Sequence, residues 1–148
     1  INYSKSEAEA KEVEKACRNM GAETLLVKAD VASDDDCRKM VEETINKWGR
    51  LDVLINNAGT TKFCGHGNLE GLTKDDFFYI FGTNVVGPYQ MIKWAAPYLK
   101  KTGAGCVVNV ASIAGVMGIG SSVAYCASKA ALINMTVTWP EPWDRKSE

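Results

Sequence analysis

The chain has 148 residues, of which 46% are hydrophobic and 24% charged, and its formal net charge at pH 7 is -1. This composition fits one folded domain with a real core, and it argues against disorder and against nucleic acid as a partner. No apolar run approaches the roughly 20 residues that cross a bilayer, and no signal peptide is recognisable. The five cysteines have no CxxC spacing, which fits reduced thiols. We therefore expect a cytoplasmic protein without membrane contact.

The first half of the chain alternates helical patterns with short apolar runs. Residues 7–20 and 34–48 carry apolar side chains at helical spacing, and a glycine follows each segment, so both are predicted helices. The runs at 24–29 and 51–56 are short, apolar and followed by polar residues. Runs of this kind suit strands that are buried on both faces of a parallel sheet.

The second half of the chain continues this alternation. Thr73, with Asp76 three residues later, resembles a capping box that begins a long helix ending near residues 100–101. A third apolar run at 106–111 predicts another strand, which like the run at 51–56 suits burial on both faces, and a last helix is predicted from about 123 to 138. This order predicts an α/β fold with a doubly wound, Rossmann-like parallel sheet, whose ligands bind beyond the carboxyl ends of the strands.

Small and polar residues follow the predicted strands, and further polar residues lie on the helices. These motifs are Asp30-Val31, Asn56-Asn57-Ala58-Gly59, Asn84, Ser112 and Tyr125-Cys126-Ala127-Ser128-Lys129. In this order and spacing they resemble the classical short-chain dehydrogenase/reductase family, over residues 1–138. Within that family the general resemblance is to 3-oxoacyl-carrier-protein reductases and sugar dehydrogenases. The resemblance implies an oxidoreductase that transfers hydride between a nicotinamide cofactor and a small carbonyl or alcohol substrate.

The tyrosine and the lysine of the last motif are the first catalytic candidates. Tyr125 and Lys129 are four residues apart, so on a helix their side chains leave the same face. A nearby ammonium favours the phenolate, which suits Tyr125 to give a proton to a forming alkoxide or to take one from an alcohol. The resemblance adds a hydrogen bond from Lys129 to the nicotinamide ribose. The alternative is an exposed pair on a surface helix.

Ser112 and Asn84 complete the catalytic set. Ser112 ends a predicted strand, where its hydroxyl could donate to the substrate oxygen; the alternative is a turn or cap residue. Asn84 lies inside the long helix, and Pro88 lacks the N–H that the carbonyl of residue 84 would bind there. The resemblance implies that this carbonyl holds a water in a proton relay through Lys129. The alternative is a kink without catalytic meaning.

The resemblance also implies the residues that contact the cofactor. Asp30 and Val31 match the pair beside the adenine, and residues 57–59 (Asn57, Ala58 and Gly59) lie beside the adenosine ribose, with Tyr125 and Lys129 at the nicotinamide end. The rival interpretation of Asp30 is a residue that only starts a turn.

The kind of dinucleotide is indicated by the first residues. The stretch 2–5 (Asn-Tyr-Ser-Lys) has no acid where NAD-binding chains place one to bond the ribose, which favours NADP over NAD. His66, the one histidine, has no metal-ligand spacing around it, so we expect a solvated loop residue and no metal.

Both ends of the chain depart from the family pattern. The glycine-rich turn that binds pyrophosphate would precede residue 1, and the remaining strands would follow residue 138, so we expect a domain over 1–138 that is truncated at both ends. Residues 139–148 contain two prolines where a helix would continue. We hypothesise that this atypical tail arises from a shifted reading frame, which the encoding nucleotide sequence would decide.

Two functions of different classes remain open from the sequence. One is an enzyme when whole, which the resemblance implies to be a homotetramer or homodimer through the long helix and the Tyr125 helix. The other is an inactive or partner-binding fragment, because the pyrophosphate turn is absent. We expect little or no activity from these 148 residues alone.

Overall fold

The computed structural model describes residues 1–138, and the predicted tail at 139–148 lies outside the described residues. In chain order the elements are β1 (Asn2–Tyr3), α1 (Glu7–Asn19), β2 (Val27–Lys28), α2 (Asp34–Trp48), β3 (Val53–Asn56), α3 (Lys74–Phe81), the π-helix η1 (Gly82–Val86), α4 (Gly87–Lys101), β4 (Cys106–Asn109), α5 (Ala114–Met117) and α6 (Val123–Thr138). The three helices predicted at 7–20, 34–48 and 123–138 are confirmed as α1, α2 and α6. None of the described helices combines the length and the apolarity that a membrane span requires.

The strands form two parallel pairs, β1 with β2 and β3 with β4. The parallel α/β class is thus confirmed, but within residues 1–138 no strand joins β1 to β3, so the pairs are separate. The observed strands are shorter than the predicted runs. Strand β2 keeps only the two residues that face the two-residue strand β1, because a ladder extends only as far as its partner.

The predicted long helix has an irregular centre. It begins at the expected capping box, where Thr73 Oγ1 accepts from the Asp76 N–H at 3.2 Å and Asp76 Oδ2 accepts from the Thr73 N–H at 2.8 Å. The wider turn of η1 then separates α3 from α4. Pro88 removes an N–H from the first turn of α4, which explains why regular α-helical bonding does not continue through this point.

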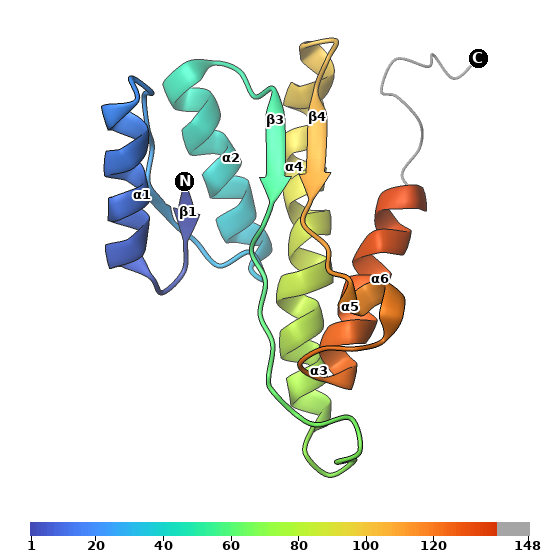
Figure 1. Cartoon of the computed structure of the whole chain (residues 1–148). Coiled ribbons are helices and arrows are strands. Elements are labelled where there is room, and N and C mark those ends of the chain that lie inside the picture. Colours follow the sequence, from blue (N-terminus) through green and yellow to red (C-terminus); the bar gives the residue numbers. More distant parts are fainter. Residues whose placement is uncertain (139–148) are drawn as a thin grey trace, which may run out of the picture.

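The main core lies between α2, α4 and β3. Figure 1 shows α4 running behind β3 and β4, with α2 between α1 and β3. The buried residues of this core are Val31, Cys37, Val41, Leu54, Met91, Ile92, Ala95 and Leu99.

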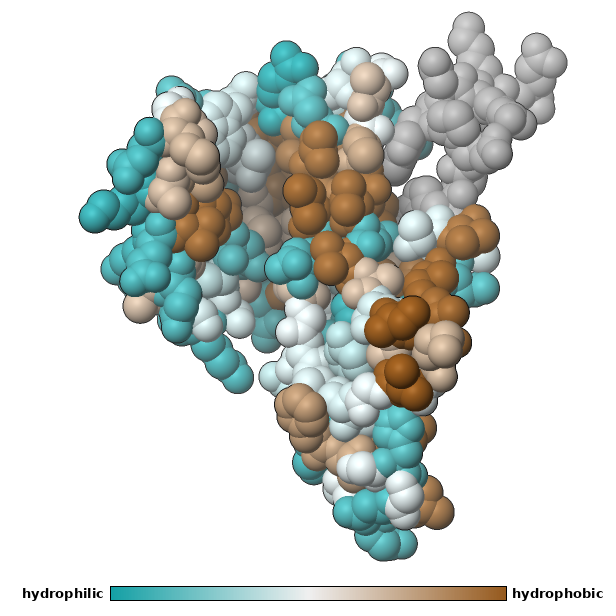
Figure 2. Space-filling view, in the orientation of Figure 1, coloured by the Kyte–Doolittle hydropathy of each residue, from teal (hydrophilic) through white to brown (hydrophobic). Residues whose placement is uncertain are grey.

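The opposite face of the β3–β4 pair is exposed. Val53, Ile55 and Val108 point away from α4 and are largely accessible to solvent. Figure 2 shows apolar side chains gathered over these two strands. The prediction that both runs are buried on both faces is therefore wrong for β3 and β4, because α4 covers one face and no described element covers the other.

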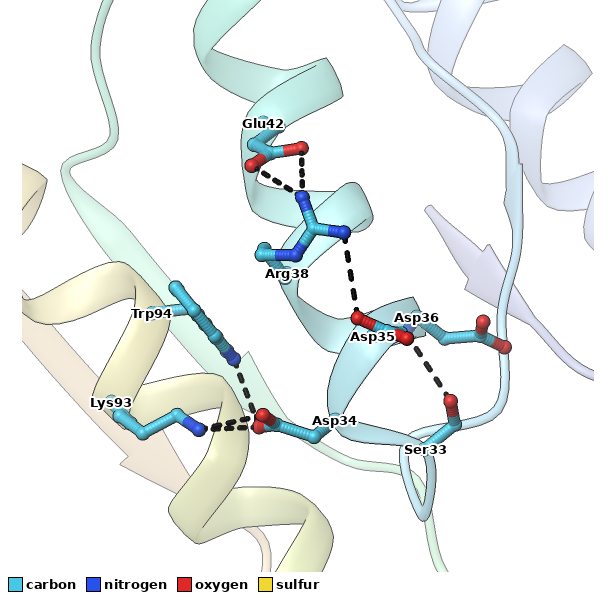
Figure 3. Close-up of polar contacts among 8 residues, drawn as sticks. All are labelled: Ser33, Asp34, Asp35, Asp36, Arg38, Glu42, Lys93 and Trp94. Carbon is cyan, nitrogen blue, oxygen red and sulfur yellow. Dashed lines mark hydrogen bonds and ion pairs between the residues drawn. The ribbon is translucent and has the colours of Figure 1, made fainter.

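Charged side chains join α2 to α4, in a contact that we call the α2–α4 seam (Figure 3). Lys93 Nζ donates to the two carboxylate oxygens of Asp34 at 2.6 and 2.8 Å, and Trp94 Nε1 donates to one of them at 2.9 Å. The hydrogen bonds from Lys93 and then Trp94 hold the pKa of Asp34 below its usual value. Beside them, Gln90 Nε2 donates to the carbonyl of Val31 at 2.9 Å, so the seam also fixes the loop after β2.

Candidate active site

The first turns of α6 bring the predicted tyrosine and lysine together. Ser122 Oγ accepts from the Tyr125 N–H at 3.3 Å and caps the start of the helix. Lys129 Nζ lies 5.9 Å from the centre of the Tyr125 ring, and both side chains line a cavity of about 510 Å³, which we call the smaller cavity. Lys129 is only 4% exposed, so the two residues do not form an exposed pair on a surface helix.

The ammonium of Lys129 is held at the carboxyl end of β4. Its Nζ donates to the carbonyl of Val110 at 2.8 Å, which ties α6 to the strand end. Burial disfavours the charged form and lowers the pKa of Lys129 from its usual value. An ammonium has three N–H donors, so this group can serve further acceptors in the cavity.

Ser112 lines the same cavity as Tyr125 and Lys129. Its Oγ accepts from the Ala114 N–H at 3.2 Å, as the cap interpretation expected, and the hydroxyl keeps its own proton to donate. Close packing positions this segment, since a Cβ added at Gly115 would lie 2.6 Å from the backbone carbon of Lys129. The glycine therefore lets α5 lie directly against the helix that carries the tyrosine and the lysine.

Asn84 is fully buried in η1 and is bound at both ends of its amide. Its Oδ1 accepts from the Thr60 N–H at 2.8 Å, and its Nδ2 donates to the Thr60 carbonyl and to Ser128 Oγ, both at 2.9 Å. We call these three residues the Asn84 network. The network joins the loop after β3 to α6, so Asn84 does more than mark a kink. The predicted role of its carbonyl stays a prediction.

Sequence reasoning missed the two partners of Asn84. Ser128 Oγ also donates to the carbonyl of Tyr125 at 2.8 Å, and a serine three residues after the tyrosine on one helix was a usable signal for that contact. No local pattern links Asn84 to Thr60, because 24 residues separate them in the sequence.

A cavity of about 790 Å³, the larger cavity, lies at the carboxyl ends of β1 and β2, and Asp30 and Val31 contribute to its lining. Asp30 Oδ1 accepts from the Ala32 N–H at 2.9 Å, and Asp36 Oδ2 accepts from the Asp30 N–H at the same distance. Asp30 therefore starts a turn, as the rival interpretation holds, and also faces the cavity.

The two cavities share Gly59 and Thr60 in their linings. A Cβ added at Gly59 would lie 3.6 Å from both Asn84 Oδ1 and Lys129 Nζ, so the backbone passes close to these groups. Eight of the nine predicted site residues line one cavity or the other, and the ninth, Asn84, bonds to Thr60.

His66, for which the sequence predicts a solvated loop residue, is exposed in the loop after β3, and its Nε2 lies 3.9 Å from Cys126 Sγ. Within residues 1–138 no group of three or more His, Cys, Asp or Glu side chains is arranged to hold a metal ion. In the smaller cavity the polar side chains of the described lining are hydroxyl, amide, phenol and ammonium groups.

Known proteins resemble this chain in sequence over nearly its whole length. The profile of the short chain dehydrogenase family matches residues 1–147. An uncharacterised oxidoreductase of Thermotoga maritima is 40% identical over 131 residues, which are 88% of this chain and 50% of that protein. A 3-oxoacyl-acyl-carrier-protein reductase of Staphylococcus epidermidis is 31% identical over 138 residues, which are 93% of this chain and 55% of that protein.

Solved structures show the same fold. A protein of Burkholderia xenovorans described as a short-chain dehydrogenase/reductase has a TM-score of 0.90 at 39% identity, over 93% of this chain and 58% of its own. An NAD⁺-bound xylitol dehydrogenase has a TM-score of 0.82 at 29% identity, over 90% of this chain and 50% of its own. The chain spans about half the length of the curated relatives that it matches.

Proposed function

The chain belongs to the short-chain dehydrogenase family, and from this premise we propose that it carries the catalytic groups of a nicotinamide-dependent oxidoreductase acting on carbonyl or alcohol substrates. One observation carries the proposal: Ser112, Tyr125 and Lys129 line a single cavity beyond the carboxyl ends of β3 and β4. The relatives described as a reductase and as an NAD⁺-bound dehydrogenase support the same chemistry.

A dinucleotide suits the two cavities because they share Gly59 and Thr60. In our proposal Asp30, Val31 and residues 57–59 hold the adenosine half, and Tyr125 and Lys129 face the nicotinamide half. Gly59 admits a close approach of the cofactor to the backbone, since it has no Cβ. When bound, the nicotinamide supplies or accepts the hydride.

The side chains of the smaller cavity would handle the proton and the charge. Ser112 Oγ donates to the substrate oxygen, and Tyr125 delivers a proton to that oxygen in reduction or takes it in oxidation. The buried ammonium of Lys129 stabilises the negative charge left on the phenol oxygen, because charges interact more strongly away from water. We propose that Asn84 positions a water molecule in a proton relay through Lys129.

The decisive test of this function removes one hydroxyl. Made in the whole enzyme rather than in these 148 residues alone, Tyr125→Phe should lower kcat for NADPH-dependent ketone reduction by about 10²- to 10⁴-fold, the usual contribution of a positioned general acid. Its Kd for NADPH, measured by fluorescence, should stay within about threefold of the parent value, because the same ring remains. Tyr98→Phe is the matched control, since Tyr98 lies on α4 and lines neither cavity. Equal turnover in the two variants would contradict the proposal.

We propose NADP rather than NAD as the cofactor. Ser4, Lys5 and Ser6 line the larger cavity, and their hydroxyls and ammonium suit an additional phosphate. Lys5→Glu should weaken NADPH binding by about tenfold and leave NADH binding nearly unchanged. Lys15→Glu carries the same charge change on an exposed residue of α1 outside the lining. Tighter binding of NADH than of NADPH by the parent chain would contradict NADP.

A second candidate function is a chain that binds a partner without catalysis. The exposed apolar face of β3 and β4, with Val53, Ile55 and Val108, favours it, since such patches mark interaction surfaces. Ile55→Lys should then abolish partner or self-association in sedimentation experiments, while Tyr125→Phe changes no measured property. The enzyme proposal predicts the reverse, namely a large effect of Tyr125→Phe and a small effect of Ile55→Lys.

Two further proposals concern assembly and location. We propose a homodimer or homotetramer through the long helix of η1 and α4 and through α6, because Val86 in η1, Tyr89 on α4 and Val137 on α6 are exposed. Light scattering coupled to size exclusion would measure the assembly, and a monomer at all concentrations would contradict it.

We also propose a cytoplasmic protein, which all five cysteines support by being free.

A further inference from the structure

Three exposed apolar side chains stand on the rim of the smaller cavity. Phe63, Ile113 and Ile119 all line it, and they are 84%, 66% and 59% exposed. Phe63 lies on the loop after β3, whereas the two isoleucines flank α5, so the chain brings them together from separate loops. Exposed apolar side chains gathered around a cavity mark a surface that contacts a ligand.

Anchored neighbours hold Phe63 at this rim. Before it, the hydroxyls of Thr61 and Ser121 are 2.5 Å apart; after it, the Cys64 N–H donates to the carbonyl of Ser121 at 2.8 Å. Lys62 Nζ donates to Asp76 Oδ2 at 2.7 Å. The backbone is therefore fixed on both sides of the phenyl ring, which keeps the ring at the cavity although solvent reaches it.

The polar side chains of this cavity are largely committed to other partners. Thr61 and Ser121 bond to each other, Lys129 donates to a carbonyl, and Thr60 Oγ1 donates to Tyr79 Oη at 3.3 Å. Asn57 belongs to the proposed cofactor contacts. Two hydroxyls remain for the substrate, those of Ser112 and Tyr125, and both serve the reacting oxygen.

Charge recognition is also limited in this cavity. Lys129 is the one charged side chain in its described lining, and in the proposed function its ammonium already serves the nicotinamide half and the phenol oxygen. A carboxylate or phosphate on the substrate would need its own cation, and a polyol would need several hydrogen-bonding groups, because buried polar groups without partners are costly. The described lining offers neither beyond the reacting oxygen.

We propose that the substrate is an uncharged ketone, or the corresponding secondary alcohol, whose hydrocarbon chain lies against Phe63, Ile113 and Ile119. These three side chains would then determine specificity. The inference rests on the proposed function, since it places the carbonyl at Ser112 and Tyr125. The overall change is balanced: ketone, NADPH and one proton give the secondary alcohol and NADP⁺.

Three five-carbon ketones test the inference on the whole enzyme, because we expect little or no activity from these 148 residues alone. They are 2-pentanone, the polyol ketone xylulose and the anion 4-oxopentanoate, so carbon number is constant while polarity and charge change. We expect kcat/KM for 2-pentanone to exceed the other two by at least about tenfold. Lengthening the chain from 2-pentanone to 2-heptanone should raise kcat/KM by about fourfold for each methylene that contacts the rim.

Variants of Phe63 test whether the rim causes this gain in kcat/KM. Phe63→Ala should remove most of the gain between 2-pentanone and 2-heptanone, and Phe63→Leu should restore it. Phe78→Ala is the matched control, because Phe78 is also exposed but lies on α3, outside both linings. An unchanged chain-length dependence in Phe63→Ala would overturn the inference.

Ligand-observed saturation-transfer NMR with 2-heptanone and xylulose separates this inference from the proposed function. Turnover of xylulose or 4-oxopentanoate in preference to 2-pentanone overturns the apolar substrate and leaves hydride transfer standing. Absence of turnover, with saturation transfer to 2-heptanone that Phe63→Ala reduces, overturns the proposed function and supports the apolar site. Absence of both turnover and saturation transfer overturns the inference itself.

Discussion

Hydrogen bonds in the Asn84 network are neutral and centre on a fully buried amide, whereas those at the α2–α4 seam are charged and reach solvent. The amide of Asn84 is fully buried and all of its partners lie inside the protein. Asp34 and Lys93 are about half exposed and pair at 2.6 Å (Figure 3). Water can therefore replace a lost partner more readily at the seam than around the buried Asn84 side chain.

The contrast indicates at which residues a substitution would most affect the stability of the fold and the geometry of the site. Exposed ion pairs contribute at most about 1 kcal/mol, whereas each buried polar group left unsatisfied costs about 1–3 kcal/mol. The site should therefore respond sharply to changes around Asn84 and Gly115 and weakly to changes at Asp34. Variants that alter one region at a time would test this contrast.

Asn84→Ala should have the largest effect. It leaves the Thr60 N–H, the Thr60 carbonyl and the Ser128 hydroxyl without their buried partner, so the free energy of unfolding should fall by about 3 kcal/mol or more. Urea denaturation measures the loss. The control is Asn46→Ala, an exposed position in α2, where the change should stay within about 0.5 kcal/mol. Equal losses in the two variants would refute the contrast.

Gly115→Ala should come second. The added Cβ would lie 2.6 and 2.7 Å from backbone atoms of Lys129 and Ala130, so α5 must move away from α6, at a cost of about 1–3 kcal/mol. Gly59→Ala is the matched control for stability, because its Cβ would meet nothing closer than 3.6 Å. Thermal unfolding of both variants measures which of them loses more stability. If Gly59→Ala were the less stable of the two variants, the packing of α5 against α6 around Lys129 would be looser than these distances imply.

Local sequence determined the parts of the fold that depend on neighbours along the chain. Helix α2 matches its predicted bounds because Ser33 Oγ accepts from the Asp36 N–H at its start and Gly49 adopts a φ of 70° at its end. The spacing of Tyr125 and Lys129 likewise fixed their common face. Strand lengths and burial were wrong because they depend on which elements lie alongside, as the exposed face of β3 and β4 shows.

Contacts between distant residues escaped prediction at the site. The motif order indicated the positions of Asn84 and Ser112, but nothing local indicated that the amide would bond to Thr60, or that Lys129 would bond to the Val110 carbonyl. Phe63 carried no pattern at all, since its place at the cavity depends on the anchoring of its neighbours by Ser121.

The charge of Lys129 should give a smaller, pH-dependent effect. Its pKa in the folded chain is lowered by burial from the usual 10.5, so between these two values the unfolded chain binds more protons. Stability attributable to this group therefore rises as the pH approaches 10.5 from below, and is constant at lower pH. The difference in unfolding free energy between the parent and Lys129→Met, followed by urea titration from pH 7 to 10.5, should increase in favour of the parent. A flat or decreasing difference would contradict the burial of a charged lysine.

Asp34→Asn should have the smallest effect and the clearest salt dependence. Asparagine can still accept from Trp94 Nε1, so the variant removes mainly the charge that faces Lys93. Because hydrogen bonds hold the pKa of Asp34 below its usual 3.8, its contribution is present above that pH and is lost as the pH falls through the lowered value. At pH 7 the Tm should drop by less than in Gly115→Ala, and 1 M NaCl should shrink the drop, because salt screens exposed charges. Asp35→Asn, which loses only the 3.4 Å contact with Arg38, should change Tm still less. A large loss that salt does not reduce would mean that the α2–α4 seam behaves as a buried contact, and the contrast with the Asn84 network would then fail.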